Sequence, residues 1–247
     1  MKVAAIADIH GNLMALEAVL ADIKKQGVDL TVNLGDLLSG ALQPRETAEY
    51  LMSLQLPTVR GNHERQLLDD TRPMGLSDSL ARSAINDTQL QWLKALPASL
   101  NIEQEILLVH ATPADDVTYW LETITAGGRR AATSEEAIAR GGEPNVSLVL
   151  CGHTHIPRDL MLPNGTLIVN PGSVGLQAYD DEAPLPHVME TGSPHARYAI
   201  LIRTGTAWRV EYRQVAYDWE GAARLALQNG RKDCVAALRH GRVVMPG

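Results

Sequence analysis

Short apolar runs alternate with helical patterns in the first part of the chain, and this alternation limits the fold more than any other feature. Residues 2–7 predict a buried strand, and the apolar spacing over 13–23 predicts a helix that ends at Gly27. Residues 28–34 predict a second strand, and Pro44 begins a second helix. A chain that alternates in this way is expected to form an α/β fold whose functional side chains gather at the carboxyl ends of its strands.

The run 147–155 shows what stands at such a strand end. Its apolar part reaches Gly152, which we expect to free the backbone for a turn, and His153 and His155 follow at once. On an extended segment, residues i and i+2 point the same way, so both imidazoles should reach one place. Imidazole is the commonest protein metal ligand near neutral pH. A pair of solvated loop histidines is the alternative, and the rest of the chain argues against it.

Similar side chains follow the other apolar runs, because five separate segments place polar residues at a strand end or in the next loop. These residues are Asp8, His10, Asp36, Asn62, His63, His110, His153 and His155. Nitrogen and carboxylate ligands in this number exceed the needs of one tetrahedral ion, but they suit two divalent ions of the transition series. A structural zinc site would favour clustered cysteines, whereas Cys151 and Cys234 lie far apart.

Five sequence blocks resemble those of the calcineurin-like metallophosphoesterases, in the same order and at matching spacing from residue 1 to about 175. The blocks are Asp8-Ile9-His10, Gly35-Asp36, Gly61-Asn62-His63-Glu64, Val109-His110 and Gly152-His153-Thr154-His155. The loop 170–175 further resembles the small bacterial and archaeal phosphodiesterase branch. The resemblance implies a four-layer α/β/β/α sandwich of two mixed β-sheets flanked by helices, with the site at one edge.

The resemblance also implies a role for each residue. One metal ion would be bound by Asp8, His10 and His155, a second by Asn62, His110 and His153, and Asp36 would bridge the two. The ions would be Mn, Fe, Zn or Ni, with Mn favoured, and would make hydroxide available near pH 7. His63 would be the catalytic residue that contacts phosphate or protonates the leaving group. Ser39 stands where the protein-phosphatase branch has a second Asp, so His63 is expected to lack its usual acidic partner.

The charge balance argues against several functions. The chain has 22 basic and 29 acidic residues, a net charge of −7, and no basic cluster larger than Arg129-Arg130. Binding of nucleic acid through a basic surface is therefore not expected.

No apolar run approaches the roughly 18 residues of a membrane span, so no membrane partner is expected. The two distant cysteines suit a reducing cytoplasm, where we expect the protein to be located.

The remaining segments complete an expected single domain over 1–247 with two helical excursions. Residues 64–98 should be mostly helical and carry no chemistry, and residues 113–145 either cover the site or pack on the sheet. Asn164-Gly165 predicts a hairpin. Residues 180–196 are expected to be a connection whose His187 and His195 stay outside the site.

The leading interpretation is a dinuclear metal-dependent phosphoesterase that acts on a small phosphodiester or phosphomonoester, with nucleotides among the candidates. The alternative is a non-catalytic scaffold, since a retromer subunit of similar fold has lost catalytic residues. The complete ligand set and the presence of His63 favour the enzyme. The sequence leaves open the physiological substrate, the native metals and the oligomeric state.

Overall fold

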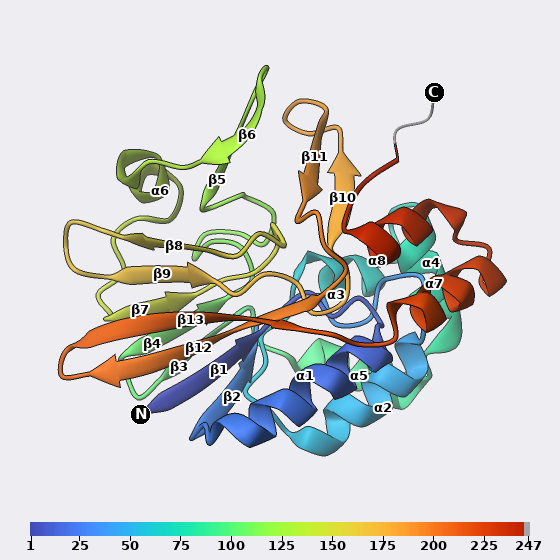
Figure 1. The fold of residues 1–247 in the computed structure, drawn as a ribbon, viewed down its shortest axis with the longest axis horizontal. Coiled ribbons are helices and arrows are strands. Elements are labelled where there is room, and N and C mark those ends of the chain that lie inside the picture. Colours follow the sequence, from blue (N-terminus) through green and yellow to red (C-terminus); the bar gives the residue numbers. More distant parts are fainter. Residues whose placement is uncertain (245–247) are drawn as a thin grey trace.

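Two mixed β-sheets pack face to face in the computed structural model, which describes residues 1–244 (Figure 1). The first sheet has the order β13-β12-β1-β2, in which β1 and β2 are parallel and β12 is antiparallel to both of its neighbours. Its strands are β1 (Lys2–Ile6), β2 (Leu30–Asn33), β12 (Ala196–Thr204) and β13 (Ala207–Val215).

The second sheet has the order β3-β4-β7-β9-β8. Its three central strands are parallel, and each edge strand is antiparallel to its neighbour. Its strands are β3 (Ser99–Ile102), β4 (Ile106–Val109), β7 (Leu148–Leu150), β8 (Arg158–Met161) and β9 (Leu167–Asn170). Within each sheet, the parallel strands therefore have their carboxyl ends at the same edge.

The alternation of side chains along β1 explains the layers. Val3 and Ala5 face the second sheet and pack in the buried cluster between the sheets, with Leu150 of β7. Ala4 and Ile6 point the other way, into the cluster formed with the helices. Because both faces of β1 are buried, the strand is apolar throughout.

Helices cover the outer face of the first sheet, and a smaller layer covers the second (Figure 1). The helices that contribute to the first outer cluster include α1 (Leu13–Gln26), α2 (Pro44–Leu54) and α5 (Asp87–Ala95). On the second sheet, Trp120 and α6 (Ser134–Gly141) pack against Val149 and Ile168. The predicted four-layer α/β/β/α sandwich of two mixed sheets is confirmed.

Short helices and hairpins complete the described chain. The helices are α3 (Asn62–Leu67), α4 (Leu76–Ala84), α7 (Trp219–Gln228), the 3-10 helix η1 (Lys232–Cys234) and α8 (Val235–His240). The hairpins are β5 (Glu122–Thr125) with β6 (Gly128–Ala131), and β10 (Ala178–Asp181) with β11 (His187–Glu190). Within residues 1–244, no helix combines the length and apolar character needed to cross a bilayer.

Several local predictions are confirmed. Gly27 ends α1 in the left-handed conformation with φ 61°. Gly165 forms the turn between β8 and β9 with φ 90°.

Two predictions about connections are wrong. Residues 113–145 were expected to be a helical excursion, but they contain the β5–β6 hairpin as well as α6, because Ala126 and Gly127 form a hairpin turn. Residues 180–196 were expected to be an irregular connection, but they include most of the β10–β11 hairpin.

Candidate functional site

All eight predicted site residues lie at one edge of the sandwich. Asp8 and His10 follow β1, Asp36 follows β2, His110 follows β4, and His153 and His155 follow β7, while Asn62 and His63 begin α3. Backbone hydrogen bonds join these loops, including His10 N to Asp36 O at 3.0 Å and Gly152 N to His110 O at 2.7 Å. Parallel strands bring their carboxyl ends together, which is why ligands distant in sequence meet here.

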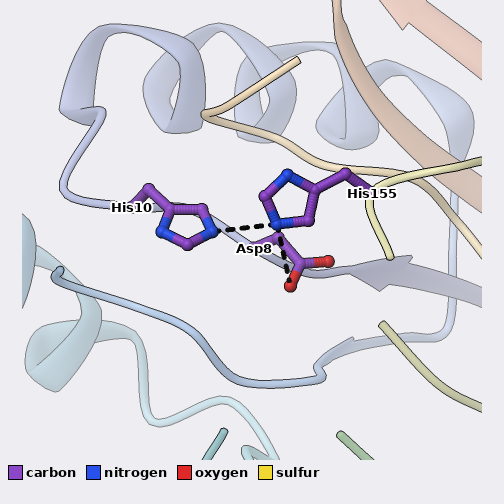
Figure 2. A group of neighbouring side chains, drawn as sticks. All are labelled: Asp8, His10 and His155. Atoms are coloured by element: carbon purple, nitrogen blue, oxygen red, sulfur yellow. Dashed lines mark hydrogen bonds and ion pairs between the residues drawn. The ribbon is translucent and has the colours of Figure 1, made fainter. Parts of the chain in front are cut away.

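The titratable residues form two buried clusters. Asp8, His10 and His155 make up the first, and Asp36, His110 and His153 the second, with the ligand atoms in each cluster within 4.8 Å of one another (Figure 2 shows the first). Asn62 joins the second cluster, since its Oδ1 lies 3.0 Å from His110 Nε2. Asp36 Oδ2 lies 3.2 Å from the same nitrogen.

Backbone carbonyls determine which ring nitrogen of each histidine is available. The Nδ1 atoms of His10, His110 and His155 lie 2.6, 2.8 and 2.8 Å from the carbonyl oxygens of Ser39, Leu34 and Leu176. A carbonyl only accepts, so each Nδ1 donates its proton, and in a neutral ring the lone pair is then on Nε2.

His153 has the opposite orientation. Its Nε2 lies 2.9 Å from the Val117 carbonyl oxygen and donates to it, so in a neutral ring the lone pair is on Nδ1. Hydrogen bonds of this kind orient metal-binding histidines and fix their tautomer.

The first cluster suits a cation. His10 Nε2 and His155 Nε2 face each other at 3.0 Å, although the carbonyl partners leave both without a proton in the neutral rings (Figure 2). Asp8 Oδ1 lies 3.7 Å from His155 Nε2, and the buried Asp8 Oδ2 has no hydrogen-bond partner among the described residues. Three electron-rich groups meet in one buried place, so the residues present fit a divalent metal ion.

Burial and charge set the protonation of these groups. Burial lowers the pKa of His10 and of His153 to about 4, so both rings are neutral near pH 7, the form that binds metal. Burial raises the pKa of Asp8 to about 8. Burial alone would lower the pKa of His110, but the negative charge of Asp36 raises it to about 10.

Asp36 acts on both clusters. Burial opposes ionisation of its carboxyl, but the positive charges of His110 and His63 bring the pKa of Asp36 well below its usual range. Its negative charge raises the pKa of His110 and opposes the lowering of the His10 pKa by burial, and these two histidines belong to different clusters. A carboxylate with these neighbours is the natural candidate for a shared ligand.

Left-handed backbone is concentrated at the site. Eight non-glycine residues of the described chain have positive φ, and five of them are the candidate ligands Asp8 (55°), His10 (51°), Asp36 (55°), His153 (70°) and His155 (60°). Such conformations cost about 1–3 kcal/mol each and persist only where the surrounding structure enforces them. Their concentration here is typical of a functional site.

These φ angles contradict the expectation that His153 and His155 lie on an extended segment and reach one place. The segment is not extended, and the two imidazoles enter different clusters. Gly152 also has a different role from the one expected, because its φ is not positive. A Cβ at Gly152 would lie 2.9 Å from Asp8 Oδ2, so the position needs space rather than backbone freedom.

Glu64 connects two of the ligand loops. Its fully buried carboxylate accepts hydrogen bonds from the backbone N–H groups of Asp36 at 2.9 Å, Leu37 at 2.8 Å and Gly61 at 2.8 Å. Burial raises the pKa of Glu64. The sequence placed Glu64 in a motif, but its part in holding the loops follows only from these contacts.

Comparison with known families agrees with this geometry. The model of the "Calcineurin-like phosphoesterase superfamily domain" matches residues 1–191. The chain belongs to this superfamily. The matched region contains every candidate ligand and His63, whereas α7, η1 and α8 lie beyond it.

Individual proteins are similar to the chain in sequence or in structure. The chain is 29% identical over 202 residues to an uncharacterized protein of Methanocaldococcus jannaschii, covering 70% of this chain and 76% of the relative. A metallophosphoesterase from Sphaerobacter thermophilus matches in structure with a TM-score of 0.73 and 24% identity, over 96% of this chain and 98% of that one. A candidate diadenosine tetraphosphatase matches with a TM-score of 0.54 and 20% identity, over 87% and 94% of the two chains.

One prediction drawn from the superfamily resemblance is wrong. His63 does have an acidic partner, because its Nδ1 lies 2.7 Å from Oδ1 of the buried Asp78, in the first turn of α4. Burial opposes protonation of His63, but Asp36 and Asp78 raise its pKa to about 9. The stretch 64–98, which we expected to carry no chemistry, therefore contributes a carboxylate that contacts a candidate site residue, and no periodicity or motif around Asp78 indicated this contact.

The two other histidines considered in the sequence do not line the cavity over the clusters. His187 Nε2 lies 3.2 Å from the Tyr119 hydroxyl, and Tyr119 does line that cavity. His195 Nδ1 lies 2.7 Å from Ser193 Oγ. Residues 113–145 pack on the second sheet through Trp120, and through Val117 and Tyr119 they also border the site.

Proposed function

We propose that this protein is a dinuclear metal-dependent phosphoesterase that hydrolyses a small phosphomonoester or phosphodiester. One observation carries the proposal: two adjacent clusters of carboxylates and histidines, in which hydrogen bonds to backbone carbonyls fix the ring nitrogen that each histidine turns toward its cluster. Membership in a phosphoesterase superfamily supports the same reaction class.

The ligand sets follow the clusters. Asp8, His10 and His155 would hold one ion, and Asn62, His110 and His153 a second, with Asp36 shared between them. When bound, two divalent ions would neutralise phosphate oxygens and lower the pKa of a coordinated water. Mn²⁺ is our first choice, because carboxylate and amide oxygens accompany the imidazoles and no thiolate is present in either cluster.

His63 and Asp78 would handle the leaving group. His63 lines the cavity and donates its Nδ1 proton to Asp78, which holds the ring and leaves Nε2 to contact the substrate. A protonated His63 can donate from Nε2 to a phosphate oxygen or to the departing oxygen. Asp78 touches no substrate in this scheme and acts as a positioning residue.

Ser39 offers a further contact. Its buried hydroxyl lines the cavity and has no hydrogen-bond partner among the described residues. A buried hydroxyl without a partner is costly, so a phosphate oxygen that accepts from Ser39 Oγ would satisfy it. Ser39 stands where the protein-phosphatase branch has an Asp, and it would thus supply a neutral hydrogen-bond donor in place of that carboxylate.

The substrate is proposed to be a small phosphorylated molecule. The cavity over the clusters has a volume of about 400 Å³, within the usual range for small-molecule sites. Nucleotides are among the candidates, and similarity to a candidate diadenosine tetraphosphatase supports testing dinucleoside polyphosphates as well. A cytoplasmic location remains a prediction.

Metal content and turnover test the proposal together. Purified protein loaded with Mn²⁺ should hold about two ions per chain and cleave p-nitrophenyl phosphate or bis-p-nitrophenyl phosphate. Protein that binds no transition metal and cleaves neither ester would overturn the proposal. Metal binding without turnover of these esters or of a nucleotide panel would instead favour the scaffold.

A further inference from the structure

Part of the wall of the cavity over the clusters is formed by residues that are not candidate metal ligands. Tyr119 and Tyr179 line the cavity beside the candidate ligands, with Tyr179 on β10. Arg231, just before η1, and Ala237, in α8, extend the same wall. Both of the latter lie beyond the region that the superfamily model matches, so part of this wall belongs to this chain rather than to the common domain.

The two tyrosines are held against the candidate ligands. The Tyr119 ring lies 5.1 Å from the His153 ring and the Tyr179 ring 4.8 Å from the His155 ring, measured between centroids. The Tyr179 hydroxyl donates to the Tyr119 hydroxyl at 3.0 Å, and Tyr119 contacts His187 Nε2 at 3.2 Å. The hydroxyl groups are thus fixed beside the site.

The acceptors of the Tyr119 and Tyr179 hydroxyl protons determine which ligand groups this wall can bind. His187 Nδ1 lies 2.7 Å from the Leu185 carbonyl oxygen and donates to it, so Nε2 of the neutral ring accepts the Tyr119 proton. Tyr119 oxygen in turn accepts the Tyr179 proton. The Tyr179 hydroxyl also lies 3.3 Å from the His153 carbonyl oxygen, a second acceptor for its proton. Both phenol protons therefore have acceptors within the protein, and each phenol oxygen can still accept a hydrogen bond from the cavity.

The charged groups of the wall lead to the same conclusion. The Arg231 guanidinium is occupied by Asp233, by the Gly40 carbonyl and by Ser77 Oγ, at 2.6 to 3.3 Å. Asp180 and Asp181 also line the cavity and are exposed, and neither forms an ion pair within the described residues. Carboxylates are acceptors, so this wall has accepting oxygens and no free cation for a second phosphate.

We propose that the cavity wall formed by Tyr119, Tyr179, Asp180 and Asp181 is a subsite for the neutral, hydroxyl-bearing organic group of a substrate with a single phosphate. The inference rests on the proposed phosphoesterase function. It specifies the substrate class: an ester of a polyhydroxy compound such as a nucleoside or a glycerol, rather than a polyphosphate.

A matched three-carbon series tests the subsite through competition with a nitrophenyl ester that the enzyme cleaves. Propyl phosphate, glycerol 3-phosphate and propane-1,3-diyl bisphosphate share a chain length and differ in hydroxyl groups or in a second phosphate. Glycerol 3-phosphate should compete about fivefold better than propyl phosphate, the gain typical of one or two hydrogen bonds. The bisphosphate should compete no better than propyl phosphate, despite its extra charge.

Two variants locate the effect. Asp180→Asn with Asp181→Asn should improve competition by the bisphosphate about fivefold relative to propyl phosphate, as removal of two nearby like charges requires. Asp70→Asn with Glu135→Gln removes the same charge from exposed positions that do not line the cavity, and should leave the ratio unchanged.

Tyr119→Phe with Tyr179→Phe should abolish the preference for glycerol 3-phosphate over propyl phosphate. Tyr212→Phe is the matched control, since its hydroxyl donates to Asp159 away from the cavity. A wild-type enzyme that turns over the nitrophenyl ester but shows no hydroxyl preference, or prefers the bisphosphate, would overturn this inference alone. Absence of turnover and of bound metal would overturn the proposed function instead.

Discussion

Both the backbone and the side chain of Asp36 are constrained at the site. Its backbone is left-handed, its Oδ1 accepts from the His63 backbone at 3.1 Å, and its Oδ2 lies beside His110. Asp36→Asn would remove one negative charge from between two dications, whose repulsion would then be less screened. We expect loss of at least one metal ion per chain and of nearly all turnover.

Metal analysis and nitrophenyl ester hydrolysis check this prediction in the same preparation. Asp70→Asn is the control for loss of an aspartate charge at an exposed position. Full metal content with a near-native rate in Asp36→Asn would show that Asp36 is not the shared ligand.

His63 is the only member of the predicted set that we do not assign to a metal ion. A side chain that orients phosphate or donates a proton contributes about 100- to 10,000-fold in rate, so His63→Ala should lower kcat by that order while both ions stay bound. The loss should be smaller for a nitrophenyl ester, whose leaving group needs little protonation, than for an alkyl ester. Equal losses would point to phosphate binding alone, and loss of metal would make His63 a ligand.

Asp78 should act through His63. Asp78→Asn keeps a hydrogen-bond partner for the ring but removes the charge, and we expect a loss of about 10- to 100-fold, as for other residues that orient a functional histidine. The loss should show the same dependence on the leaving group as His63→Ala, whereas simple loosening of α4 would affect both esters equally. In His63→Ala, Asp78→Asn should have little further effect on rate.

At the scale of elements, Glu64 joins the loop after β2 to the start of α3 through three backbone hydrogen bonds. Glu64→Gln preserves the shape of the side chain but places an amide NH₂ group, which is itself a donor, against backbone N–H donors. We expect the free energy of unfolding to fall by about 2–3 kcal/mol, the cost of lost bonds to a charged group. Urea denaturation of metal-free protein measures the change, with the exposed Glu135→Gln as control. An unchanged midpoint would mean that the carboxylate does not hold the loops together.

The sequence predicted the elements whose patterns are local. Apolar runs followed by Asp, Asn or His identified the strand ends and all members of both clusters, and the resemblance assigned His153 and His155 to different ions, as the structure groups them. Positive φ at these histidines could not be predicted, because tertiary contacts impose it against the intrinsic preference of the residues.

Contacts between distant segments left no local signal. Asp78 reaches His63 from a helix 15 residues further along, so only the packing of α4 beside α3 shows the pair. The strands β5, β6, β10 and β11 carry mostly polar side chains, so no apolar run marks them in the sequence. The cavity wall formed by Tyr119, Tyr179, Asp180 and Asp181 was not predicted either, because its residues come from separate connections.

At the scale of the whole molecule, the candidate ligands join the two halves of the sandwich. Asp8, His10 and Asp36 follow strands of the first sheet, whereas His110, His153 and His155 follow strands of the second. Each cluster contains residues from both sheets. Metal ions bound here would therefore hold the sheets together at the edge where the backbone is strained, and unfolding would require their release.

Metal binding should accordingly stabilise the entire fold. An ion present at 100 times its dissociation constant contributes about 2.7 kcal/mol per site, and a chain of this size gains about 2–4 °C in Tm per kcal/mol. Saturating Mn²⁺ should then raise Tm by about 10–20 °C over chelator-treated protein, measured by scanning calorimetry. Asp36→Asn should lose at least half of this rise, whereas His63→Ala should keep it, because His63 is not a ligand in our assignment. If wild-type protein unfolds at the same temperature with Mn²⁺ and with chelator, the clusters do not bind this metal in the folded state.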